Sequence, residues 1–118
     1  MTRKEALAEL IEKVEAGSFP EDANVTELFG VAPPTRLMVY AYEAFGGSLD
    51  AAKALHDAVL PGWDCTLSIG ASHASLSEPI GINPTRGWYP GPEAEADTPA
   101  RAWLLAILRA LYAQETDA

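Results

Sequence analysis

The 118-residue sequence contains one cysteine, Cys65, and two histidines, His56 and His73. A lone cysteine cannot form a disulfide within the chain, so its expected role is burial on a strand. Neither histidine belongs to a His-Glu-x-x-His, Cys-x-x-Cys or calcium-loop pattern, and no Gly-x-Gly-x-x-Gly or Gly-Lys-Ser/Thr motif occurs. We therefore expect no metal site and no cofactor.

Basic residues are scarce. Eight Lys and Arg stand against 17 Asp and Glu, which gives a net charge of -9. Such a surface repels the phosphate backbones of DNA and RNA, and the basic residues are scattered along the chain. We expect no nucleic-acid binding through a basic patch. An acidic surface can instead mimic DNA, so an inhibitor of a host nucleic-acid-binding protein stays open as an alternative.

Long apolar runs are also absent. No stretch approaches the roughly 20 apolar residues of a membrane-spanning helix. The first ten residues carry charges in every turn, unlike the apolar core of a signal peptide. We expect a cytoplasmic protein that does not enter membranes. With 48% hydrophobic residues, residues 1–118 are predicted to form a single domain with one core.

Helical periodicity dominates the first half of the chain. An apolar stripe of two leucines, Ile11 and a valine predicts a first helix that ends at Gly17. Residues 25–30 predict one or two helical turns, and residues 35–45 predict a longer helix that ends at Gly46-Gly47. Two helices and a short helical segment are thus expected before residue 48.

A further helix is expected to begin after Ser48, whose hydroxyl suits an N-cap, and to end at Pro61-Gly62. Its inner stripe is expected to contain either Leu55 or His56, and His56 is predicted to lie at the rim of that stripe. After this break the polarity of successive residues alternates, which predicts a strand with one buried face. The residues expected on that face are Trp63, Cys65, Leu67 and Ile69.

The second half of the chain predicts a hairpin, a loop and a helix. Gly70 to His73 predicts the hairpin turn, and a second strand is expected to follow, with Pro79 favouring an edge position. Residues 83–97 are rich in proline, glycine and acid, which predicts a long loop. Thr98-Pro99 then opens a helix that is apolar almost all round and is expected to be central.

These elements predict an α+β fold in which a small sheet packs between helices. The sheet is built on a β-hairpin, with two or three antiparallel strands, and the element order is roughly α-α-α-β-β-α. Helices on both faces of the sheet would form an α/β/α sandwich. Because a two-stranded hairpin alone is marginally stable in water, the thin sheet also motivates the expectation of a homodimer.

One turn includes residue types used in hydrolysis. Ser72 and His73, with Asp64, include the components of a catalytic triad. The Gly-x-Ser-x-Gly pattern of a nucleophile elbow is incomplete, however, because Ala74 replaces the closing glycine. We expect no catalytic residue and no enzymatic activity, and we keep a small hydrolase-like enzyme with a site near Ser72 and His73 as an alternative.

Trp88 and Tyr89 are the best candidates for binding a protein partner. Two large aromatic residues in a loop can dock into a partner, and they can also fold back over the core. Whether they are exposed does not follow from the sequence. The leading hypothesis is therefore a small accessory or interaction protein without catalytic activity.

Several segments together resemble the phage ABA sandwich domain family. They are Tyr42, Ser48-Leu49-Asp50-Ala51-Ala52 with Leu55, Pro61-Gly62-Trp63, and Ala96-Asp97-Thr98-Pro99-Ala100. The family pattern has Pro-x-Gly-Trp after the helix, whereas Pro61 directly precedes Gly62 in this chain. The resemblance, which covers residue 42 to about residue 112, implies a phage or prophage protein with helices on both faces of a sheet. It implies no functional residues.

Overall fold

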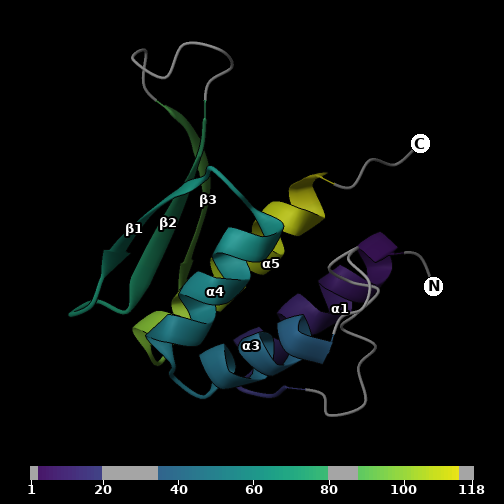
Figure 1. The fold of residues 1–118 in the computed structure, drawn as a ribbon. Coiled ribbons are helices and arrows are strands. Elements are labelled where there is room, and N and C mark those ends of the chain that lie inside the picture. Colours follow the sequence, from purple (N-terminus) through teal and green to yellow (C-terminus); the bar gives the residue numbers. More distant parts are fainter. Residues whose placement is uncertain (1–2, 20–34, 80–87, 115–118) are drawn as a thin grey trace.

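A computed structural model describes residues 3–19, 35–79 and 88–114. The elements are α1 (Arg3–Glu15), α3 (Thr35–Phe45), α4 (Leu49–Val59), β1 (Asp64–Ser68), β2 (His73–Pro79), β3 (Trp88–Glu95) and α5 (Pro99–Gln114). The predicted α+β class is confirmed, with a three-stranded antiparallel sheet on one side of the helices (Figure 1). The helical segment predicted at residues 25–30 lies outside the described residues.

The helix ends follow the predicted local signals. α3 ends at Phe45, and the second residue after it, Gly47, has a φ of 114°, in the region that favours glycine. The N–H of Ser48 donates to the Glu43 carbonyl at 2.9 Å, while the Ser48 hydroxyl accepts from the Ala51 N–H at 3.1 Å. Ser48 therefore closes α3 and caps α4, which fixes the turn between these two helices.

Helix α5 is the centre of the core, as predicted. It begins with a cap in which the Thr98 hydroxyl accepts from the Arg101 N–H at 3.1 Å. The helix contacts α1, α3 and α4 as well as β2 and β3. Its buried side chains are Ala100, Ala102, Leu104, Leu105, Ala106, Ile107, Leu108, Ala110 and Leu111. A helix that is apolar around nearly its whole circumference can cover the sheet and hold the other helices together.

The third strand, which the sequence left open, forms in a segment that was predicted as a loop. Residues 88–95, predicted as part of a loop, form β3, so the strand order is β1-β2-β3 and β2 is central. Pro79, predicted at an edge, is the last residue of this central strand and lies opposite Trp88. Between Ser75 and Ser77 the register shifts, because β3 contributes one extra residue near its prolines. Because of this bulge, the sequence of β3 does not show the regular alternation of apolar and polar residues that is typical of a strand.

The two faces of the sheet differ in cover. Ala74, Leu76 and Ala94 point to the inner face and are fully buried in the core that α5 fills. Thr66 and Glu93, which alternate with them, point to the outer face and are exposed. Among the described helices only α5 contacts the sheet extensively. The described helices thus lie on one side (Figure 1), whereas the expected sandwich has helices on both.

Ile69 differs from its predicted position. It was expected on the buried face of β1, but the strand ends at Ser68 and Ile69 lies in the following turn with 66% of its surface exposed. Trp63, Cys65 and Leu67, its predicted neighbours on that face, are half-buried against the core. The inner face of β1 is therefore covered only in part.

Candidate functional site

The outer face of the sheet is a polar surface that all three strands build together. Because side chains alternate along each strand, every second residue points outward. We define the open face as the side chains of Asp64, Thr66, Ser68, His73, Ser75, Ser77, Glu93 and Glu95. All are polar or charged, and the residues of β1 and β3 in this set are exposed. No described helix covers them.

The strand register arranges these residues in rows across the sheet. His73 lies opposite Ser68 on one side and opposite Glu95 on the other. In the next row, Ser75 lies between Thr66 and Glu93. Residues directly opposite each other have Cβ atoms about 4.5–5.5 Å apart. The first row therefore places a hydroxyl, an imidazole and a carboxylate side by side, and the second row places two hydroxyls beside a carboxylate.

The charge of the open face is negative. Its carboxylates are Asp64, Glu93 and Glu95, and the face contains no Lys or Arg. Within the described parts of the chain, none of these carboxylates has an ion-pair partner. The nearby Arg109 is already bound, because its guanidinium donates to the Glu93 backbone carbonyl at 2.5 Å and to the Glu15 carboxylate at 2.7 Å.

Ser72 and His73, the residues of the alternative hydrolase-like site, lie where the β1–β2 turn meets β2. Ser72 has a φ of 48°, and its N–H donates to the Ile69 carbonyl at 3.3 Å. Its carbonyl accepts from the Ala96 N–H at 3.1 Å, which links the turn to the end of β3. In the described structure no hydrogen bond joins the side chains of Ser72 and His73. The backbone of Ser72 thus shapes the turn, and His73 belongs to the open face.

His56 is buried, not at the rim of α4 as predicted. Only 4% of its surface is exposed, and its Nε2 lies 2.9 Å from the Trp63 carbonyl oxygen. The indole Nε1–H of Trp103 donates to its Nδ1 at 3.1 Å. Since an indole N–H only donates, Nδ1 must accept and Nε2 must carry the proton that it donates to Trp63. The neutral imidazole therefore links α4, α5 and the entry to β1.

Cys65 lies on the inner side of β1 and is half-buried. Burial, with a smaller contribution from the neighbouring Asp64 carboxylate, raises the pKa of its thiol to about 11. At neutral pH the residue is therefore a thiol, and the thiol is a poor nucleophile compared with the thiolate. The prediction that Cys65 is buried on a strand is confirmed in part.

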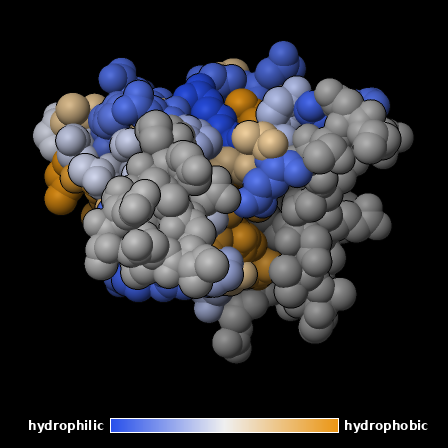
Figure 2. Space-filling model, turned by 90° about the horizontal axis from the view of Figure 1, so that it is seen from above, coloured by the Kyte–Doolittle hydropathy of each residue, from blue (hydrophilic) through white to orange (hydrophobic). Residues whose placement is uncertain are grey.

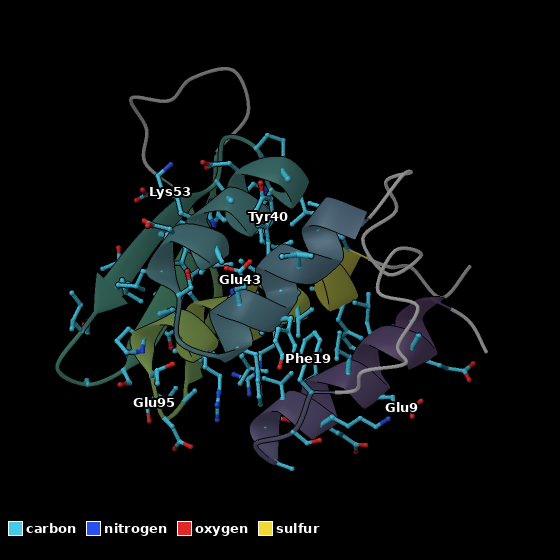
Figure 3. The ribbon with its side chains drawn as sticks, turned by 60° about the horizontal axis from the view of Figure 1, so that its bottom comes forward. Glu9, Phe19, Tyr40, Glu43, Lys53 and Glu95 are labelled. Atoms are coloured by element: carbon cyan, nitrogen blue, oxygen red, sulfur yellow. The ribbon has the colours of Figure 1, made fainter. Side chains whose placement is uncertain are left out.

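A small hollow lies between the end of α1, the end of β3 and the start of α5. Its volume is about 130 Å³, below the roughly 300–1,000 Å³ of typical ligand pockets. Arg101 lines it, but the guanidinium lies 4.0 Å from the Phe45 ring centroid and donates to the Phe45 carbonyl and to Asp97. Glu95, also at the hollow, lies at the end of the sheet beside α5 (Figure 3).

The predicted aromatic pair lies on a strand. The backbones of Trp88 and Tyr89 belong to β3, opposite Pro79 and Glu78. Their side chains fall outside the described part of the structure, so their role in binding stays a prediction. They begin the strand that ends with Glu95, and therefore lie at the opposite end of the sheet from the row of His73.

The described residues contain neither a candidate metal site nor a membrane-spanning helix. Among the described residues, no three or more His, Cys, Asp and Glu side chains form a group that could hold a metal ion. Within the same residues, every helix is too short or too polar to cross a membrane.

No family model matches the chain, and no curated protein or solved structure matches it. The similarity to the phage ABA sandwich domain family stays an expectation from the sequence.

Proposed function

We propose that this chain is a small non-catalytic interaction protein that binds another protein through the open face of its sheet. The observation that supports the proposal is that face itself, where three strands present rows of polar side chains, exposed on β1 and β3 and half-buried on β2, that no described helix covers. Small-molecule sites are usually concave and mostly apolar, whereas protein interfaces of standard size are broad surfaces. An open sheet face suits a macromolecular partner better.

The charge of the open face favours a basic partner. Its three carboxylates have no cation among them, and the chain has a net charge of -9. Complementary charge speeds association and selects against acidic partners. A partner that complements the open face would carry a basic surface, and such surfaces are common on nucleic-acid-binding proteins. The proposal therefore includes the alternative drawn from the composition, an acidic inhibitor of a host nucleic-acid-binding protein. The phage or prophage origin rests on the sequence resemblance alone.

Matched charge reversals test the proposal. Asp64→Lys/Glu95→Lys changes the open face, and Glu12→Lys/Glu43→Lys makes the same change in net charge at exposed positions on α1 and α3. Each tagged variant is used for affinity capture from lysate of the source cells, with quantitative mass spectrometry. A basic protein that binds wild type should be lost with the first pair and retained with the second. Equal retention by both pairs would contradict binding through the open face.

Hydrolysis is the second candidate, because the register places His73 directly between Ser68 and Glu95. These are the residue types of a triad, in one row on an exposed surface. Purified protein would be assayed with a simple chromogenic ester, alongside His73→Gln, Ser68→Ala and Ser72→Ala. The interaction proposal predicts the same background rate for all of them. Turnover by wild type that any of these substitutions removes would favour the enzyme.

A further inference from the structure

The segment 63–69, which contains β1 and one residue on either side of it, has an apolar side that the fold buries only in part. Trp63, Cys65, Leu67 and Ile69 alternate along the sequence, but the first three are half-buried and Ile69 is 66% exposed. In β2, by contrast, the inward-pointing Leu76 is fully buried. The reason is the position of α5, which packs mainly against β3 and β2 and reaches β1 only slightly.

This uncovered apolar surface lies at a free edge of the sheet. β1 is an outer strand, so one row of its backbone N–H and C=O groups faces no strand of the described residues (Figure 1). Figure 2 shows an isolated hydrophobic area at the left margin, on the side where Figure 1 places the β1–β2 turn. The other edge strand, β3, contains Pro90, Pro92 and a bulge, which discourage pairing, whereas β1 has none of these features.

We propose that β1 pairs antiparallel with β1 of a second copy of this chain, around a two-fold axis at Thr66. This register places Ile69 opposite Trp63 of the second copy and Cys65 opposite Leu67. All four apolar residues of each copy then lie on one face and cover one another. The exposed Ile69 gains a partner that the single chain does not offer.

The polar residues also fit this register. Asp64 lies opposite Ser68 of the second copy, so the carboxylate can accept a hydrogen bond from a hydroxyl and does not meet another carboxylate. A two-fold axis at Cys65 would leave Ile69 without a partner, and an axis at Asp64 would place two carboxylates opposite each other. Registers shifted by a single residue would set apolar residues against polar ones. The register around Thr66 is the one that uses the whole segment 63–69.

The resulting dimer has one continuous sheet of six strands, with the open faces of both copies on the same side. Such pairing is isologous, since the same edge contributes both halves of the interface. Each copy carries a net charge of -9, so the two repel at low ionic strength. Salt should therefore strengthen the dimer, whereas it should weaken binding to a basic partner. This difference separates the dimer from the proposed function.

Ile69→Lys tests the apolar part of the interface, because Ile69 is exposed in the single chain and its replacement should leave the fold intact. Val39→Lys, at a position that is 50% exposed on α3, is the matched control. Sedimentation equilibrium should show a dimer for wild type and for the control. The dissociation constant of Ile69→Lys should be about 100-fold higher, because two apolar contacts are lost per dimer. Monomeric wild type at several hundred micromolar would overturn the proposal.

Crosslinking tests the register. In a Cys65→Ser background, Thr66→Cys places one thiol from each copy at the two-fold axis. Ser75→Cys places a thiol on the same face of the adjacent strand, opposite Thr66. In the dimer, three strand spacings of about 4.8 Å separate this thiol from the same thiol of the second copy, a distance of about 14 Å. A mild oxidant should give a covalent dimer with Thr66→Cys and little with Ser75→Cys. A dimer in solution without this difference would assign the association to another surface and overturn the pairing of β1.

Discussion

The inner and outer faces of the sheet come from the same three strands but have different environments. In β2, Leu76 is fully buried under α5, while its neighbour Ser75 points away from every described helix. The inner residues are small or aliphatic and fill a core, and the outer residues are hydroxyls, carboxylates and His73. The comparison teaches that stability and recognition can be separated by one residue along a strand. Mutations on the two faces should therefore have different effects.

The largest expected effect is on the helix that covers the inner face. Leu105 is 2% exposed at the centre of α5, so Leu105→Ala should lower the free energy of unfolding by about 3–5 kcal/mol through lost burial and a cavity. Urea denaturation followed by circular dichroism measures the change. Val39→Ala, on the exposed side of α3, should change it by less than about 0.5 kcal/mol. Similar losses for both variants would contradict the central role of α5.

The rate at which a thiol is alkylated can be compared between the two faces of β1. Because only the thiolate reacts, Cys65 with its pKa of about 11 should be alkylated at least about 10-fold more slowly at pH 8 than the thiol of Thr66→Cys in a Cys65→Ser background. The rate at Cys65 should rise with pH until about pH 11, and denaturant should remove the difference. Mass spectrometry of timed samples gives both rates. Equal rates in the folded protein would place Cys65 outside the partly covered side.

The two histidines offer a smaller comparison. His56→Leu keeps an apolar volume but leaves the Trp103 indole N–H and the Trp63 carbonyl without their partner. The free energy of unfolding should fall by about 2 kcal/mol, since unsatisfied buried groups are costly. His73→Leu, on the open face, should change it by less than about 0.5 kcal/mol. If the two substitutions cost the same, the buried network does not stabilise the fold.

Local signals explain which elements could be predicted. The cap at Ser48, the glycines after α3 and the Thr98-Pro99 helix start all act within a few residues, and the structure contains each of them. β3 could not be predicted because Pro90, Gly91 and Pro92 break the alternation, and its strand state depends on pairing with β2. Strand pairing is a tertiary interaction, so the local pattern underestimates it.

The candidate site depends even more on distant contacts. The row Ser68, His73 and Glu95 exists only because three strands pair in one register, and Glu95 is far from the other two in sequence. His56 bonds to Trp103, 47 positions away, and no local pattern shows that contact. One available signal was its position directly after Leu55, on the apolar stripe of α4 with Ala52. The composition did predict the acidic surface.

One measurement tests the separation of the two faces most directly. Leu76→Ala and Ser75→Ala differ by one position in β2 and remove side chains from opposite sides of the sheet. Urea unfolding should show a loss of about 3 kcal/mol for Leu76→Ala and of less than about 0.5 kcal/mol for Ser75→Ala. A loss of similar size at Ser75 would mean that the outer face is also packed, and would contradict an open face available to a partner.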